Sequence, residues 1–298
     1  MSFEKGVSVI IPVLNAEKYI DICIVSLIKQ TFKDIELIFV IDKNSVDNSE
    51  NIIQKYSQEY NNIYVIKSDY AGGAGYNRLL GIESATKEFI GFVDADDCVS
   101  ENYYEILFTN AVKNNADVAI ADTIMLDENK KVISASKYEF KILNNFCEIY
   151  NTVDYSTVWD KIYRSELLKD VDELLFPTGV IHEDNLFTLK VLYSAKKIIT
   201  VENAHYFWYR NNDSVTNVEK NYQKYLEDAV TVFNQVIDVV KELNLTNDEK
   251  YAIINHNLEN YAGLLFKAKY KNDYFRQKLI SVLGISKTYE ILMTVNNK

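Results

Sequence analysis

The chain has 298 residues, of which 48% are hydrophobic and 25% are charged, with only two prolines and nine glycines. These values are typical of a globular protein with a sizeable core, and they exclude a disordered or collagen-like chain. The formal net charge of -11 argues against non-specific binding to nucleic acid, whose phosphates would repel the protein.

Strands and helices are predicted to alternate over the first hundred residues. Short β-branched or aromatic runs predict strands at 7–11, 35–41, 63–66 and 89–93. Helices are predicted between them, with Asn15 as the N-cap of the first and the glycine-rich turn 72–75 at the start of the third. Because strands that alternate with helices pair in parallel, this pattern predicts a doubly wound α/β sheet, with ligands bound beyond the carboxyl ends of its strands.

After residue 100 the pattern is less regular. It predicts a helix at 101–115, extended segments at 118–126 and 131–140, and short elements at 156–209, including a helix at 184–195. From about residue 217, apolar residues recur at helical spacing. The sequence therefore predicts an α/β domain at 1–216 and a helical C-terminal region at 217–298.

Cysteine content and hydropathy indicate the compartment. The three cysteines lie far apart and form no CxxC pair, which is typical of a protein in a reducing cytoplasm. The N-terminal segment lacks the pattern of a signal peptide, and no stretch reaches the roughly 20 apolar residues of a membrane-spanning helix. We therefore expect a cytoplasmic protein, either soluble or bound peripherally at the inner face of the membrane.

The strongest chemical signal is the acidic turn in FVDADD. Asp94, Asp96 and Asp97 follow a predicted strand, and their carboxylates repel one another unless a cation or hydrogen bonds offset the charge. Hard oxygen ligands of this kind suit Mg²⁺ or Mn²⁺ bound jointly with phosphate oxygens. An EF-hand loop is excluded, because Cys98 and Val99 stand where an oxygen ligand and a glycine are required. The alternative to a metal site is a solvated acidic turn before a helix.

Several motifs together resemble one enzyme family. The chain contains, in order, VSVIIPVLNAEKYI, ELIFVIDKNSVDNS, GGAGYNRLLGIESATKEFIGFVDADD, VWDKIYRSELL, HEDNLF and HYFWYRNNDSVT. Over roughly residues 5–216, this order and spacing resemble those of the inverting family 2 glycosyltransferases. The resemblance implies a GT-A fold, with a Rossmann-like, mostly parallel sheet. It also implies transfer of a hexose or N-acetylhexosamine from a UDP-sugar to a glycan hydroxyl, with inversion.

The resemblance assigns the nucleobase to two loops. Pro12, Val13 and Asn15 follow the first strand, and Asp42 follows the second. Members of the family usually have a second acid after this aspartate. Lys43 stands there in this chain and leaves the identity of the base open; a surface turn residue explains it equally well.

The resemblance also implies ligands for the donor's diphosphate and for a metal. The residues expected at the nucleotide sugar beyond the two loops are Arg78, Asp94, Ala95, Asp96, Lys161 and Arg210. Asp96 would ligate Mn²⁺ or Mg²⁺, and Asp97 would either share the ligation or support it. His205 is a further candidate ligand. The alternatives are a surface charge for Arg78, a solvated lysine beside a packed Trp159 for Lys161, and a structural histidine for His205.

HEDNLF contains the acidic pair that, in the resembled family, supplies the catalytic base. The pair is Glu183 and Asp184 here, and Asp184 would deprotonate the acceptor hydroxyl. Acidic residues in the first turn of a helix also serve simply to balance the helix dipole, which is the alternative.

The predicted partners are a UDP-sugar donor and a glycan or lipid-linked saccharide acceptor, and a homodimer is left open. A basic patch with interleaved aromatic residues at 267–278 suggests peripheral contact with anionic lipid, with a solvated helix face as the alternative. Two other functions remain. A sugar-1-phosphate nucleotidyltransferase would need a glycine-rich basic loop where 12–15 stand, and Lys43 alone motivates a non-catalytic, nucleotide-sugar-binding relative.

Overall fold

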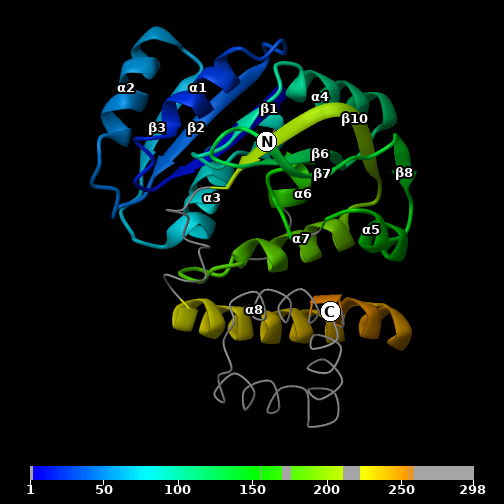
Figure 1. Ribbon diagram of the computed structural model, residues 1–298. Coiled ribbons are helices and arrows are strands. Elements are labelled where there is room, and N and C mark those ends of the chain that lie inside the picture. Colours follow the sequence, from blue (N-terminus) through cyan, green and yellow to red (C-terminus); the bar gives the residue numbers. More distant parts are fainter. Residues whose placement is uncertain (1–2, 155, 170–175, 211–221, 255, 258–298) are drawn as a thin grey trace. The chain divides into compact units, whose positions relative to one another are not determined.

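A computed structural model describes residues 3–154, 156–169, 176–210, 222–254 and 256–257 (Figure 1). The chain divides into two compact units. The first comprises residues 1–179 and 187–211, and the second comprises 180–186 and 212–298. The short segment 180–186 thus groups with the C-terminal region, although it lies between parts of the first unit along the sequence.

The first unit is built on a mixed, mostly parallel sheet. Its parallel part has the order β3-β2-β1-β4, formed by β1 (Glu4–Val13), β2 (Ile35–Ile41), β3 (Ile63–Lys67) and β4 (Lys87–Phe92). β2 is buried along its whole length, and β1 is buried from Gly6 onward. The four predicted strands are confirmed, because apolar β-branched runs suit strands covered on both faces.

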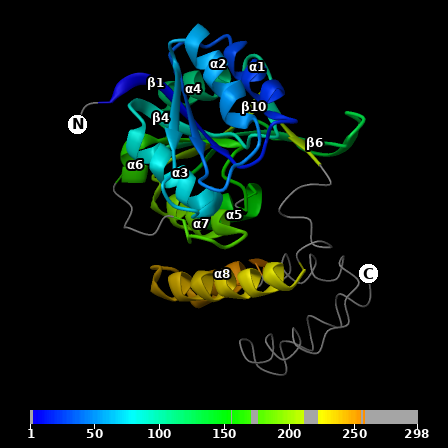
Figure 2. The ribbon, with the colours of Figure 1, turned by 90° about the vertical axis from the view of Figure 1, so that its left-hand side faces the viewer.

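Three helices connect these strands, α1 (Ile20–Ile28), α2 (Ser49–Glu59) and α3 (Gly73–Ser84). In both views α1 and α2 lie on one face of the sheet and α3 lies on the other (Figures 1 and 2). α3 packs closely against the sheet at Gly81, where an added Cβ would lie 2.3 Å from a methyl carbon of Ile10. The fold is therefore doubly wound, as predicted.

The N-cap prediction for Asn15 is wrong. The first helix begins at Ile20 after Tyr19, and Asn15 has a left-handed φ of 51°. Its side-chain oxygen instead accepts a hydrogen bond from the backbone N–H of Val46 at 2.9 Å. The side chain therefore joins two loops and does not cap a helix.

The second part of the sheet mixes strand directions. It contains β9 (Lys161–Arg164), β6 (Val118–Leu126), β10 (Ile198–Tyr209) and β5 (Cys98–Val99), with β7 (Val132–Ser136) and β8 (Lys141–Leu143) at its margins. β9 is antiparallel to both β4 and β6, whereas β10 runs parallel to β6. The sequence predicted only short elements at 156–209, and the 12-residue β10 corrects that expectation.

The remaining described helices are α4 (Tyr103–Asn114), α5 (Phe146–Thr152), α6 (Ser165–Lys169), α7 (Glu183–Ser194) and α8 (Tyr222–Glu242), and residues 247–254 are also helical. The expected helical C-terminal part is therefore present. Within the described residues, no helix is long and apolar enough to cross a membrane. The basic patch at 267–278 lies outside the described residues.

Candidate active site

Two loops at the carboxyl end of the parallel strands are joined by hydrogen bonds. The backbone N–H of Asn15 donates to Ser45 Oγ at 3.0 Å, and that of Ala16 donates to Ser49 Oγ at 2.9 Å. The loop after β1 is therefore held against the loop after β2. Pro12 and Val13 are buried at the base of the first loop.

Asp42 lies between these loops and α3. Its carboxylate accepts hydrogen bonds from the backbone N–H of Asn44 at 2.9 Å and from the side-chain amide of Asn77 at 3.0 Å. Its own N–H donates to the carbonyl of Val13 at 2.8 Å. Two of the predicted nucleobase residues are thus brought together, while Lys43 is exposed in the following turn. Asn77 was not predicted, because an asparagine within a helix carries no signal of its own.

Arg78 forms an ion pair with Asp94. Its guanidinium lies 2.8 Å from Asp94 Oδ1 and 5.7 Å from the centre of the Phe176 ring. The Arg78 side chain is only 5% exposed, so the alternative of a helix-surface charge is wrong. Because the cation is held against Asp94, it offsets part of the negative charge of the acidic turn.

Asp97 is the buried member of the acidic turn. Its side-chain oxygens accept hydrogen bonds from the hydroxyl of Tyr206 at 2.8 Å and from the backbone N–H of Tyr209 at 2.9 Å. Burial, followed by the charges of Asp96 and Asp94, raises the pKa of Asp97 well above its ordinary value. Since both of its oxygens already accept protein hydrogen bonds, this geometry favours the supporting role over a share in metal ligation.

Asp94 and Asp96 are the half-buried carboxylates of the turn, and Ala95 between them is buried. Among the described residues, no group of three or more histidine, cysteine, aspartate or glutamate side chains is arranged to hold a metal ion. Two carboxylates nevertheless fit a small hard cation, because Mg²⁺ is commonly bound by one or two carboxylates together with phosphate oxygens of the substrate. The donor set is therefore suited to a metal that arrives with a diphosphate.

Glu183 and Asp184 form the first turn of α7, in the second compact unit. Glu183 is buried and Asp184 is half-buried. Just before them, the N–H of Ile181 donates to Asp228 Oδ2 at 2.9 Å, which ties this segment to α8. The role of the pair as a source of the catalytic base stays a prediction.

Comparison with known proteins identifies the family. The model of glycosyl transferase family 2 matches residues 8–171, more than half of the chain. The chain belongs to this family. The resemblance predicted from the motifs is confirmed, and the alternative of a sugar-1-phosphate nucleotidyltransferase is set aside.

Three similar proteins, GlyA, TarS and PcManGT, illustrate the relationship. Glycosyltransferase GlyA of Streptococcus pneumoniae is 26% identical over 95% of this chain, which spans 42% of the length of GlyA. The Staphylococcus aureus poly(ribitol-phosphate) β-N-acetylglucosaminyltransferase TarS is 31% identical over 67% of this chain and 35% of TarS. A crystal structure of TarS residues 1–349 in complex with UDP-GlcNAc superposes with a TM-score of 0.66 at 23% identity, covering 97% of this chain and 79% of that one.

The third similar protein is the mannosyltransferase PcManGT of Pyrobaculum calidifontis, whose structure was solved in complex with GDP-Man and Mn²⁺. It superposes with a TM-score of 0.60 at 15% identity, covering 98% of this chain and 80% of that one. At these levels of identity the two solved structures show the fold, and the predicted GT-A fold is confirmed.

Lys161 of this glycosyltransferase is fully buried, so the alternative of a solvated lysine is wrong. Its ammonium donates to the carbonyls of Asp154 at 2.7 Å and Thr157 at 2.8 Å, and it pairs with the carboxylate of Asp160. Burial raises the pKa of Asp160, and the Lys161 cation opposes that shift. Since a lysine ammonium has three protons to donate, this geometry favours a structural role over contact with the donor.

Replacing Lys161 with methionine is expected to lower the free energy of unfolding by about 3–5 kcal/mol, because it leaves the Asp160 carboxylate buried without its cation. Urea unfolding would measure the loss. The double variant Lys161→Met, Asp160→Asn removes both charges and is expected to recover much of it. A single variant as stable as the wild type would contradict the importance of this pair.

His205 lies on β10, and Arg210 directly follows the strand. The His205 ring is 3.4 Å from a carboxylate oxygen of Asp122 on β6, and its side chain is 29% exposed. Successive side chains of a strand point to opposite faces, and the next residue, Tyr206, contacts the acidic turn. The geometry therefore favours the structural alternative for His205. Arg210 is exposed just after the strand, where its backbone N–H donates to the carbonyl of Leu126 at 2.9 Å.

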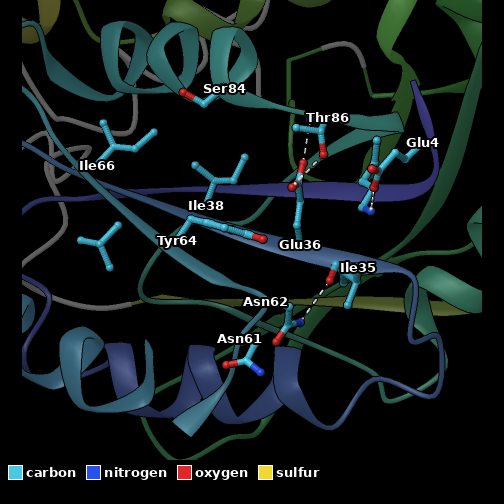
Figure 3. Close-up of a pocket in the computed structure, with 12 residues that line it drawn as sticks. Glu4, Ile35, Glu36, Ile38, Asn61, Asn62, Tyr64, Ile66, Ser84 and Thr86 are labelled. Atoms are coloured by element: carbon cyan, nitrogen blue, oxygen red, sulfur yellow. Dashed lines mark hydrogen bonds and ion pairs between the residues drawn. The ribbon is translucent and has the colours of Figure 1, made fainter. Parts of the chain in front are cut away.

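A hollow of about 670 Å³ lies beside the edge strand β3 (Figure 3). Glu36 lies within it, and its carboxylate accepts hydrogen bonds from Ser8 Oγ and from the hydroxyl of Thr86. None of the predicted site residues lines this hollow. The predicted site residues Asp42 and Arg78 and the acidic turn lie instead at the carboxyl ends of the strands, where ligands of such sheets bind.

Proposed function

We propose that this glycosyltransferase transfers a hexose or N-acetylhexosamine from a UDP-sugar to a hydroxyl group of a glycan, with inversion and with Mn²⁺ or Mg²⁺. One observation carries the proposal: the acidic turn at the end of β4 is held in shape by protein hydrogen bonds and by Arg78, with Asp94 and Asp96 half-buried at its surface. The crystal structure of TarS with UDP-GlcNAc supports a UDP-sugar as the donor.

The nucleobase would bind at the two joined loops. Asp42 would accept a hydrogen bond from a base N–H, while Pro12, Val13 and Asn15 would form the wall beside the ring. The 2.8 Å hydrogen bond between Asp42 and Val13 supports a single binding surface formed by both loops.

The donor's diphosphate would bind at the acidic turn. Asp96 would hold the cation, with Asp94 next to it and Asp97 as the buried support. The cation would stabilise the negative charge that develops on the departing nucleoside diphosphate. The complex of PcManGT with Mn²⁺ supports a divalent cation in this fold.

Asp184 would serve as the general base. The acceptor's hydroxyl oxygen forms a bond with the anomeric carbon while the bond from that carbon to the diphosphate breaks, and the hydroxyl proton passes to the Asp184 carboxylate. The nucleoside diphosphate leaves with the bonding electron pair. Direct displacement from the opposite side inverts the anomeric configuration and needs no protein nucleophile.

The acceptor would be a glycan or a lipid-linked saccharide. The poly(ribitol-phosphate) substrate in the name of TarS supports a surface polymer as the class of acceptor. Attachment at the inner face of the membrane and a homodimer stay predictions.

A thermal-shift screen of UDP-, GDP- and dTDP-sugars, each with Mn²⁺ or with EDTA, tests the donor class. A UDP-sugar with Mn²⁺ is expected to stabilise the protein most, by about 2.7 kcal/mol at a concentration of 100 times Kd. A larger shift with a GDP-sugar would overturn the UDP assignment. Slow metal-dependent hydrolysis of the best donor would exclude the non-catalytic relative.

A further inference from the structure

We propose that Tyr206 is a positioning residue of this enzyme, whose hydroxyl group holds the acidic turn in the shape that receives the metal and diphosphate. The proposal rests on the proposed function, since it assigns that turn to metal and diphosphate binding. Tyr206 lies on β10, more than one hundred residues after the turn, within the motif HYFWYRNNDSVT, and the sequence alone predicted no role for it.

The Tyr206 hydroxyl contacts both ends of the acidic turn. It accepts a hydrogen bond from the backbone N–H of Asp94 at 3.1 Å and donates one to Asp97 Oδ2 at 2.8 Å. The turn is closed by the N–H of Asp97, which donates to the carbonyl of Asp94 at 3.0 Å. Asp96, the proposed metal ligand, lies between these two fixed points.

These hydrogen bonds oppose the mutual repulsion of the carboxylates. Without a cation, three carboxylates in four residues favour a more open turn in which their charges are farther apart. Asp97 Oδ1 also accepts a hydrogen bond from the backbone N–H of Tyr209, at 2.9 Å. The Tyr206 hydroxyl therefore keeps the turn preorganised before the metal and diphosphate bind, which lowers the free energy needed to bind them.

The Tyr206 ring is held independently of its hydroxyl. It is fully buried, and the Trp159 ring stacks on it with centroids 4.3 Å apart and planes inclined by 26°. Trp159 is itself fixed, because its carbonyl accepts a hydrogen bond from the hydroxyl of Tyr103 at 3.1 Å. Tyr206 also pairs with Val99 between β10 and β5. Removing the hydroxyl oxygen therefore leaves the ring in place, and Tyr206→Phe isolates the two hydrogen bonds.

The test is isothermal titration of UDP into the full chain with Mn²⁺ and, separately, with EDTA. For Tyr206→Phe, the Kd of UDP with Mn²⁺ is expected to rise about tenfold, in keeping with the loss of a hydrogen bond to a charged group. The Kd in EDTA is expected to change by less than about twofold, because in the proposed site the nucleobase binds at the two joined loops and not at the acidic turn.

Tyr163→Phe is the matched control. Tyr163 is also fully buried, and its hydroxyl donates to the carbonyl of Val158 at 3.1 Å, a group that is not part of the acidic turn. The same oxygen is removed from the same residue type, so a general loss of packing would affect both variants alike. For this control, the ratio of the Kd of UDP in EDTA to the Kd of UDP with Mn²⁺ is expected to equal that of the wild type.

The outcomes separate this proposal from the proposed function. If UDP binds the wild type and Asp96→Ala equally well with Mn²⁺ and with EDTA, the metal site is wrong and the role of Tyr206 falls with it. If the wild type needs Mn²⁺ and Asp96→Ala does not respond to it, but Tyr206→Phe matches the wild type, only the role of Tyr206 is overturned. A Tyr206→Phe protein that did not fold would make the hydroxyl structural and would also overturn it.

Discussion

Asp184→Asn is expected to lower kcat for sugar transfer by about 10²–10⁴-fold, the range typical of losing a general base, while the Kd of the donor stays unchanged. Asparagine has the same size as aspartate but cannot take up the hydroxyl proton at neutral pH. Steady-state rates with a saturating donor and acceptor, together with titration of the donor, would measure the two effects separately.

Glu183→Gln is the natural control for this variant, because it removes the neighbouring charge from the same first turn of α7. Its effect on kcat is expected to be much smaller. The assignment would move to Glu183 if this variant were inactive and Asp184→Asn kept the full rate. Equal, small effects in both would leave the pair as acids that balance the helix dipole.

Asp96→Ala is expected to raise the Kd of UDP in the presence of Mn²⁺ about 100-fold, to the value measured for the wild type in EDTA. The variant removes the carboxylate that we assign to the cation, so Mn²⁺ should no longer strengthen binding. Calorimetric titration with and without EDTA measures the change. Asp238→Ala, at an exposed position on α8 with a side chain 74% exposed, is the control for loss of an aspartate.

The same variant carries an expectation for stability. The charge of Asp96 contributes to raising the pKa of the buried Asp97, so the carboxylates of the turn repel one another in the metal-free protein. Removing one of them is expected to leave the metal-free protein at least as stable as the wild type. An Asp96→Ala protein that bound UDP poorly because it was unfolded would contradict this expectation. A melting curve distinguishes an unfolded variant from a folded variant that has lost its metal ligand.

The parallel part of the sheet could be predicted because its signals are local. The run at 35–41 is mostly apolar, rich in β-branched residues and bounded by aspartates, and the predicted bounds match those of β2. In the mixed part of the sheet, the predicted bounds 118–126 match those of β6. Asn15 shows where local reasoning fails. An asparagine before a helical pattern predicts an N-cap, but the loop after β2 offers a backbone N–H that its side chain binds instead.

The acidic turn itself was visible in the sequence, but the groups that hold it were not. Tyr206 and Tyr209 reach Asp97 only because β10 returns to the sheet and pairs with β5. One signal was available: Ala204 and Tyr206 are buried on one face of β10 while His205 is not, as strand alternation would predict. Which residue that face would meet depends on tertiary pairing.

The acidic turn and the residues that hydrogen-bond to it lie far apart in the sequence, which has a consequence for protein engineering. The family match ends at residue 171, yet the two groups that donate to Asp97 come from residues 206 and 209. A protein shortened at that boundary would retain its carboxylates but lose the strand that shapes them. Chimeras of two relatives joined between 171 and 197 would likewise combine a turn from one parent with a tyrosine from the other. If the crossover is placed after β10, the acidic turn and the tyrosines that bind it come from the same parent protein.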